Sequence, residues 1–113
     1  MKIGVTSQNF RTITGHAGKS RRFLIFDSQE DGGVQQADRL DLPKEMSMHD
    51  FRGEDHPIDD LDVLITGGCG DGFIQRMASR GIEVVQTGEK SITTAVESYL
   101  GGAELPPPEE YSH

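Results

Sequence analysis

The chain has 113 residues, a formal net charge of −8, 34% apolar residues and a single cysteine, and this length predicts one domain with a modest core. A negatively charged chain is repelled by nucleic acid and by anionic membrane surfaces, so both are excluded as expected partners. One cysteine forms no internal disulfide, and no segment approaches the roughly 20 apolar residues of a membrane span. We therefore expect a cytoplasmic protein.

The positive charges gather near the N-terminus. Residues 1–26 contain five cations and neither aspartate nor glutamate, although the whole chain has 19 acidic residues. These cations are Lys2, Arg11, Lys19, Arg21 and Arg22. A compact basic segment on an acidic protein suits a small anion, because nucleic acid needs a basic footprint that spans several phosphates.

Three segments of the first half favour β-structure. KIGVT at 2–6 and RFLIF at 22–26 are rich in β-branched and aromatic residues, and the second has the uninterrupted apolar run of a strand buried on both faces. VQQADRLDL at 34–42 is polar enough for an edge strand that completes a hairpin. Residues 43–60 lack clear periodicity and are interpreted as a connecting loop or short helix.

A polar loop of about 15 residues separates the first two predicted strands and contains the sequence TITGHAGKS. Loops of this length inside a compact domain are uncommon and usually functional. We therefore expect this basic loop to contribute to the site.

The second half begins with a strand, a glycine turn and a helix. LDVLIT at 61–66 predicts a buried strand that runs directly into GGCGDG at 67–72. Asp71 is then placed to cap a helix, which Gly81 ends. The apolar residues with helical spacing between these two limits are Phe73, Ile74, Met77 and Ala78.

A further strand and helix complete the predicted domain. IEVVQ at 82–86 indicates the strand, and Ser91 caps a helix that ends at Gly101 and Gly102. The remaining residues, 103–113, are rich in proline and acidic residues and are predicted to be a flexible tail. The apolar positions of this second helix are Ile92, Ala95, Val96, Tyr99 and Leu100.

These five strands and two helices, in the order ββββαβα, predict a single α/β domain with a mixed five-stranded sheet. We expect the strands at 2–6 and 61–66 to be neighbours, with a hairpin on one side and parallel crossovers on the other. Open sheets of this kind bind ligands where the strand order reverses. The basic loop and the glycine turn would then face one crevice.

Four segments together resemble a known family. KIGVTSQNF, GHAGKSRRFLIF, LITGGCGDGFIQRMASRGIEVV and SITTAVESYLGG, in this order, are similar to the dinitrogenase iron-molybdenum cofactor biosynthesis family of the NifX and NifB C-terminal type, over residues 1–102. The resemblance implies a ribonuclease-H-like fold. It also implies a protein that binds and carries a preformed iron-sulfur or iron-molybdenum cluster between donor and acceptor proteins, without catalysis of its own.

The residues supply what such a carrier needs. One cysteine cannot hold a cluster that takes four thiolates. A preassembled cluster brings its own sulfides, so it needs only one or two protein ligands and nearby cations. Glycines help because they let backbone N–H groups approach the cluster. Since strand side chains alternate, at most one of Arg21 and Arg22 joins the site. The candidate cluster-binding residues are His16, Gly18, Lys19, Arg21, Gly67, Gly68 and Gly70, and the candidate metal ligands are His16, Cys69, His49 and His56.

Simpler roles and other functions stay open at this point. His16 and Cys69 are also compatible with a structural loop histidine and a small packed residue. A glycine turn before a helix also binds phosphate, so a protein or enzyme for a small phosphorylated anion is the alternative, although GGCGDG lacks the lysine and hydroxyl of a P-loop. Nucleic-acid hydrolysis would need clustered carboxylates, which the end of the first strand lacks. A homodimer that shares one cluster is also possible, and the sequence leaves open whether the host fixes nitrogen.

Overall fold

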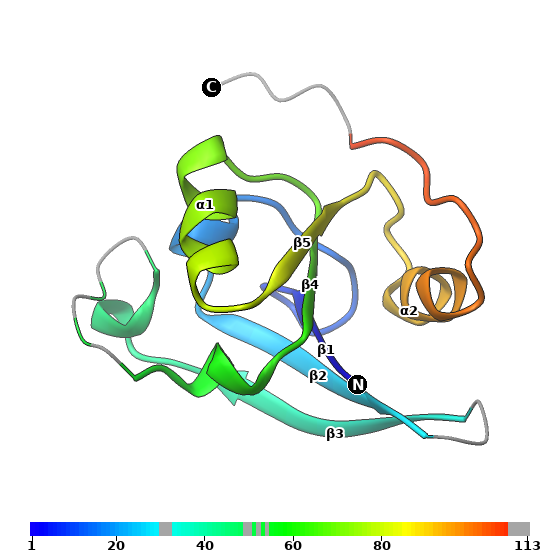
Figure 1. The fold of residues 1–113 in the computed structure, drawn as a ribbon, viewed down its shortest axis with the longest axis horizontal. Coiled ribbons are helices and arrows are strands. Elements are labelled where there is room, and N and C mark those ends of the chain that lie inside the picture. The colour runs from blue at the N-terminus through cyan, green and yellow to red at the C-terminus, as the bar shows by residue number, and fades with distance from the viewer. Residues whose placement is uncertain (30–32, 49–50, 52, 54, 109–113) are drawn as a thin grey trace.

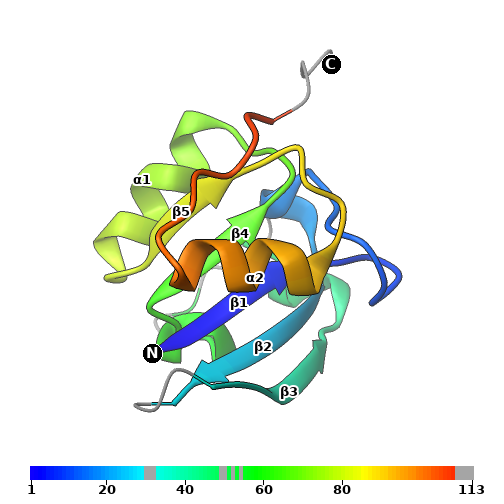
Figure 2. The same ribbon diagram turned by 90° about the vertical axis from the view of Figure 1, so that its right-hand side faces the viewer.

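Five strands form one mixed sheet in the order β3-β2-β1-β4-β5 in the computed structural model, which describes residues 1–29, 33–48, 51, 53 and 55–108 (Figures 1 and 2). The neighbouring strands β1 and β4 are parallel, as are β4 and β5, whereas β2 is antiparallel to both β1 and β3. The predicted mixed five-stranded sheet and the predicted pairing of its first and fourth strands are thus confirmed. The strands are β1 (Lys2–Thr6), β2 (Arg22–Ser28), β3 (Val34–Asp41), β4 (Val63–Thr66) and β5 (Glu83–Gln86).

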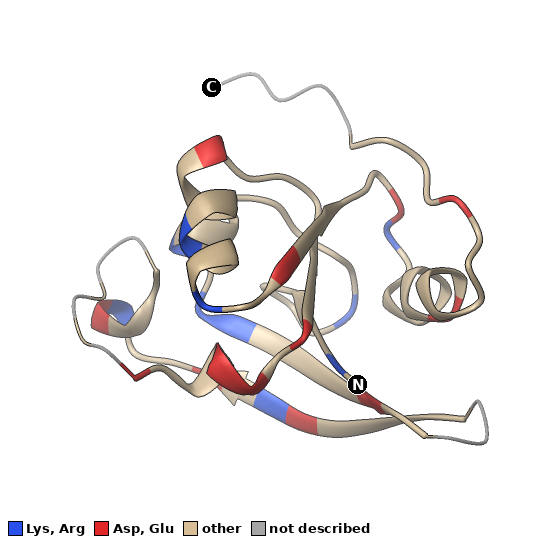
Figure 3. Ribbon diagram, in the orientation of Figure 1, with Lys and Arg blue, Asp and Glu red and all other residues tan. Residues whose placement is uncertain are grey.

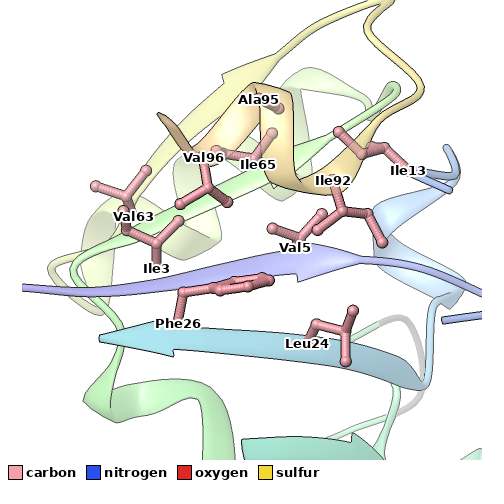
Figure 4. Packing of buried hydrophobic residues seen from close by; sticks show 10 residues of the cluster. All are labelled: Ile3, Val5, Ile13, Leu24, Phe26, Val63, Ile65, Ile92, Ala95 and Val96. Atoms are coloured by element: carbon pink, nitrogen blue, oxygen red, sulfur yellow. The ribbon is translucent and has the colours of Figure 1, made fainter. Parts of the chain in front are cut away.

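Two helices cover opposite faces of this sheet. The helix α2 (Ile92–Leu100) crosses one face in Figure 2, and α1 (Asp71–Ser79) packs behind the other. Strand side chains alternate between the two faces, so the sheet builds two apolar clusters, one under each helix. The cluster under α2, shown in Figure 4, consists of Ile3, Val5, Ile13, Leu24, Phe26, Val63, Ile65, Ile92, Ala95 and Val96.

The helix α1 ends as its sequence predicts but begins one residue differently. Gly81 has a φ of 79°, and the N–H groups of Gly81 and Ile82 donate to the carbonyls of Ala78 and Met77 at 3.0 and 2.9 Å. These two bonds form a Schellman motif, in which a left-handed glycine ends the helix. Asp71 is the first helical residue and Gly70 takes the cap position, so the expectation that Asp71 caps the helix is wrong. Its carboxylate still lies in the first turn, where negative charge is favourable.

The helix α2 follows its predicted limits. The hydroxyl of Ser91 accepts a hydrogen bond from the N–H of Thr94 at 3.3 Å, and Gly102, with a φ of 77°, follows the last turn. Residues beyond 102 continue against the domain, because the hydroxyl of Thr87 donates to the carbonyl of Pro106 at 2.7 Å and Leu105 packs on the cluster under α2. Leu105 and Pro106 of the predicted tail are therefore in contact with the domain.

The segment before β4 contains short 3-10 turns. They are η2 (Lys44–Met46) and η3 (Pro57–Asp60), and Leu61 caps the second. This cap explains why β4 begins at Val63 rather than at the predicted residue 61. Within the described ranges, no helix has the length and apolar character that crossing a membrane requires.

Candidate functional site

The carboxyl ends of β1 and β4 lie at the same edge of the sheet because these two strands are parallel. The basic loop 7–21 follows β1, and the glycine turn follows β4. Two backbone hydrogen bonds join the two segments: Gly67 donates to the carbonyl of Thr14 at 3.0 Å, and Ala17 donates to the carbonyl of Gly68 at 3.2 Å. The expected meeting of the basic loop and the glycine turn is confirmed.

Glycine at position 67 is required by this close approach. A Cβ atom on Gly67 would lie 3.2 Å from the nitrogen of Gly15 and 3.2 Å from the carbonyl carbon of Thr14. Both neighbours are backbone atoms, so they cannot move aside as a flexible side chain would. Gly67 thus acts by letting the loop pack on the end of β4.

The amides of the glycine turn bond within the protein. Gly67 uses its N–H for Thr14, the N–H of Gly68 faces the hydroxyl of Thr66 at 3.4 Å, and the N–H of Cys69 donates to the side-chain oxygen of Gln86 at 3.3 Å. We expected these glycine amides to approach a cluster, and the structure corrects this expectation for Gly67 and Gly68. Amides this close to the core need partners, and the neighbouring segments supply them. Gly70 is exposed at the start of α1.

A hollow of about 180 Å³ lies in the basic loop, next to this junction. Two of the predicted site residues, His16 and Lys19, line it, and both are exposed. The hydroxyl-bearing Ser20, only 5% exposed, forms part of its wall. The full lining is Gln8, Thr14, Gly15, His16, Lys19 and Ser20.

His16 has an unusual backbone conformation. Its φ of 54° and ψ of 50° lie in the left-handed region, and it begins the 3-10 turn η1 (Ala17–Lys19). The N–H of Lys19 donates to the carbonyl of His16 at 2.9 Å, and the Ser20 hydroxyl lies 3.2 Å from the same oxygen. Because Ala17 is fully buried, the turn holds its methyl group in the core and leaves the imidazole outside. A non-glycine residue in this region costs free energy and is often found at functional sites.

Arg22 contacts the loop, whereas Arg21 does not line the hollow. The guanidinium of Arg22 donates to the carbonyl of Gln8 at 2.9 Å, pairs with Asp41 at 3.3 Å and lies 5.6 Å from the ring centre of Phe10. The carbonyl of Arg21 accepts the N–H of Leu42. The prediction selected Arg21 from this pair, but it is the side chain of Arg22 that bonds to the loop at Gln8 and lies over Phe10.

Gly18 lies beside the hollow but is absent from its lining. A Cβ atom at Gly18 would approach the ring of Phe73 at an ordinary 3.8 Å. Gly18 therefore faces Phe73 of α1 rather than the imidazole of His16.

Cys69 packs against the apolar cluster under α1 and is half-buried. Burial raises the pKa of its thiol, and the negative charge of Asp71 raises it further. A thiol with a raised pKa is less ionised near neutral pH, and the thiolate is the form that binds metal. The surroundings of Cys69 therefore favour the protonated thiol over the thiolate.

His56 is a structural residue in this fold. Only 6% of it is exposed, its Nδ1 accepts the N–H of Ile58 at 3.1 Å, and its Nε2 lies 2.5 Å from the carbonyl of Met46. Because both ring nitrogens are used, the prediction of His56 as a metal ligand is corrected. The other predicted histidine of this segment, His49, lies outside the described residues. In the part of the chain that the structure describes, no three His, Cys, Asp or Glu residues are arranged to hold a metal ion.

The charge around the hollow follows from the sequence. Between β1 and β2 the ribbon carries cations and no acidic residue, whereas acidic positions are spread over the rest of the protein (Figure 3). Fold and site together define a small α/β protein with a basic loop at the point where antiparallel pairing in the sheet changes to parallel pairing.

The comparisons with known proteins identify the family. A family model described as dinitrogenase iron-molybdenum cofactor matches residues 1–102. The chain therefore belongs to the dinitrogenase iron-molybdenum cofactor family, and the resemblance seen in its sequence is confirmed. A search of curated proteins found no significant match.

Three solved structures have similar folds. The crystal structure of PH0822 has a TM-score of 0.75 and 22% identity, with 99% of this chain and 100% of that chain covered. A proposed dinitrogenase (mj0327) of Methanocaldococcus jannaschii has a TM-score of 0.70 and 12% identity over 98% of this chain and 97% of its own. A proposed NifB protein (TM1290) of Thermotoga has a TM-score of 0.59 and 13% identity, covering 99% and 97%. At these identities the likeness shows the fold alone.

Proposed function

We propose that this protein binds a preformed iron-molybdenum cofactor, or a precursor iron-sulfur cluster, and carries it between donor and acceptor proteins without catalysis of its own. The family links the chain to this cofactor. The observation that carries the proposal is the exposed, left-handed His16 beside Lys19 at the mouth of a hollow in a loop without acidic residues.

The chemistry of the hollow suits an anionic cluster. A neutral imidazole is a good ligand for an exchangeable iron position, and the ammonium of Lys19 would offset the negative charge of the cluster. The hydroxyl of Thr14 and the amide of Gln8 line the same hollow, and such groups hydrogen-bond to sulfides or to carboxylates on the cargo. The hydroxyl of Ser20 donates instead to the backbone of the loop. His16 and Lys19 are exposed, so a cluster held by them would stay accessible to an acceptor protein.

A single imidazole is a weak attachment, and this is an advantage for a carrier. A site with four thiolates, as in ferredoxins, holds its cluster permanently. One ligand supported by positive charge permits release when an acceptor offers more ligands. A second ligand from another copy of the chain would strengthen binding, and measuring the mass of the loaded protein would reveal it.

The test is anaerobic titration of the protein with isolated iron-molybdenum cofactor and, separately, with a preformed [4Fe–4S] cluster. His16→Asn is the most informative variant, because asparagine tolerates the left-handed conformation but lacks the imidazole. We expect it to weaken binding at least about tenfold, and Lys19→Gln to weaken it less. Lys44→Gln, which removes an exposed cation from η2, is the matched control and should bind like wild type.

Two results would contradict the proposal. Wild-type protein that takes up neither cluster would exclude the carrier function, and undiminished uptake by His16→Asn would exclude His16 as the ligand. Iron, molybdenum and sulfide analysis together with the absorption spectrum provides the readout.

Binding of a small phosphorylated anion is the second candidate. The hollow combines the ammonium group of Lys19 with the hydroxyl of Thr14 and the amide of Gln8, and phosphate oxygens accept hydrogen bonds from all of these groups. Titration with inorganic phosphate, followed by backbone NMR shifts, would distinguish it from the first candidate. Saturable shifts confined to the loop 14–20 in a protein that binds no cluster would favour it.

A further inference from the structure

Two threonines end the neighbouring strands on which the site is built. Thr6 is the last residue of β1 and Thr66 is the last residue of β4, and both are 0% exposed. Their hydroxyl oxygens lie 2.9 Å apart. Valine would fill the same space and has a higher preference for strands, whereas a buried hydroxyl is costly unless it is bonded. The presence of threonine rather than valine at both positions therefore indicates that the hydroxyl groups have a role.

The hydroxyls form a chain that leads from the glycine turn to the basic loop. The oxygen of Thr6 lies 2.6 Å from the carbonyl of Thr14, which can only accept, so Thr6 donates there. Each hydroxyl has one proton, so once Thr6 donates to Thr14 the 2.9 Å contact between the threonines takes its proton from Thr66. The Thr66 oxygen also lies 3.2 Å from the carbonyl of Thr14 and 3.4 Å from the carbonyl of Gly68, so its one proton is shared among three acceptors. The hydroxyl of Thr66 in turn accepts from the N–H of Gly68 at 3.4 Å. Bonds linked in this way polarise and strengthen one another.

This chain holds the backbone on one side of His16, and a second contact holds the other side. The carbonyl of Thr14, which also accepts the N–H of Gly67 at 3.0 Å, lies two residues before His16. The N–H of Ala17, directly after it, donates to Gly68 at 3.2 Å. Gly15 and His16 are therefore fixed between two anchors, and a left-handed residue persists only where its surroundings determine it in this way.

We propose that Thr6 and Thr66 are positioning residues, which keep the backbone of His16 in the left-handed conformation and its imidazole at the hollow. Neither threonine lines the hollow, so both would act through Thr14 and the glycine turn rather than by touching the cargo. The role of a fixed His16 in cluster binding rests on the proposed function. Whether Thr6 and Thr66 fix His16 can be tested in the protein without a cluster.

The test compares Thr6→Val and Thr66→Val with Thr87→Val. Thr87 is a matched control, because it is also 0% exposed and follows β5, but its hydroxyl bonds to the carbonyl of Pro106. Backbone ¹⁵N relaxation of the free protein reports the order of the His16 amide. We expect an order parameter of about 0.85 in wild type and the control, and a fall toward about 0.6 in the two test variants.

Cluster titration of the same proteins provides the second readout. We expect the affinity for isolated iron-molybdenum cofactor to fall roughly fivefold in Thr6→Val and Thr66→Val, the effect of losing about one hydrogen bond. Thr6→Ser and Thr66→Ser keep the hydroxyl and should restore both the order of His16 and the affinity. A purely packing role would instead be disturbed by serine and preserved by valine.

The outcomes separate this inference from the proposed function. An unchanged order parameter at His16 in folded Thr6→Val and Thr66→Val would overturn the inference. If Thr6→Val fails to fold, Thr66→Val decides. It keeps the bond between Thr6 and Thr14, which supports folding, but removes the bonds from Thr66 to Thr6, Thr14 and Gly68. Wild-type protein that binds no cluster would overturn the proposed function, and the relaxation data would still decide whether the threonines position His16.

Discussion

The N–H of Ala17 donates to the carbonyl of Gly68 at 3.2 Å and so joins the loop after β1 to the turn after β4. Ala17 is fully buried, whereas His16 before it is exposed. This one contact therefore separates the structural part of the loop from the part available to a ligand.

Gly67 should tolerate a side chain poorly. In Gly67→Ala the new methyl group would meet the backbone of Thr14 and Gly15 at 3.2 Å, and we expect the free energy of unfolding to fall by about 1–3 kcal/mol. Urea denaturation measures this change. Gly72→Ala is the control, since a Cβ there meets nothing within 4 Å and alanine favours the helix by about 0.5–1 kcal/mol. Equal effects of both substitutions would refute the close-approach argument.

His16 should reduce the stability of the protein because of its left-handed backbone, at a φ of 54°. Replacing it with glycine removes that strain, and we expect His16→Gly to leave the free energy of unfolding unchanged or to raise it by up to about 1 kcal/mol. The same variant should lose cluster binding. The opposite substitution, Gly81→Ala at a φ of 79°, should lower stability by about 1 kcal/mol. A large loss of stability in His16→Gly would show that the imidazole has a structural role.

His56 should make stability depend on pH. Burial lowers its pKa from the ordinary 6.5, and the positive charge of Arg80 lowers it further. Near this pH the folded protein therefore binds fewer protons than the unfolded chain. The contribution of His56 to the free energy of unfolding is unaffected by protonation above pH 6.5, and the free energy falls as the pH drops below 6.5. The slope for one proton is at most about 1.4 kcal/mol per pH unit.

Urea denaturation of wild type and His56→Gln between pH 7.5 and pH 5.5, on the order of one pH unit either side of an ordinary histidine pKa, measures this slope. Glutamine keeps a polar side chain but does not titrate, so its curve should be flatter over this range. Parallel curves for the two proteins would assign the pH dependence to other groups.

Cys69 should react slowly with alkylating reagents. Burial and, second, the charge of Asp71 raise the pKa of its thiol, and only the thiolate attacks. Iodoacetamide at neutral pH should therefore modify it several-fold more slowly than a free cysteine peptide, and Asp71→Asn should increase the rate. Cys69→Ser should bind cluster within about twofold of wild type. A rapid reaction, or loss of binding in Cys69→Ser, would restore this thiol as a ligand candidate.

Much of the fold could be predicted because its signals are local. The apolar runs of β1, β2 and β4 and the helical spacing of α2 lie within single segments. Gly81 and Gly102 end the two helices because a positive φ favours glycine. The meeting of the basic loop with the glycine turn also followed from the order of the elements, since parallel strands bring their carboxyl ends to one edge of the sheet.

The roles of individual site residues depended on contacts that sequence does not specify. The glycine amides that we expected to face a ligand bond to Thr14 and Thr66 instead, and His56 uses both ring nitrogens within its own segment. Thr6 and Thr66 were missed, although each is a polar residue that ends a buried strand, and this is the signal that could have revealed them.

The elements, their order and the basic, acid-free loop can all be recognised in the sequence, because periodicity, capping residues and charge are properties of short segments. The surroundings of each polar group depend on contacts between segments far apart in the chain. The register between β1 and β4, with Val5 beside Ile65, sets where the two threonines and the glycine turn meet the loop. Buried polar groups then bond to the atoms that this packing brings near, while the exposed His16 and Lys19 line the hollow.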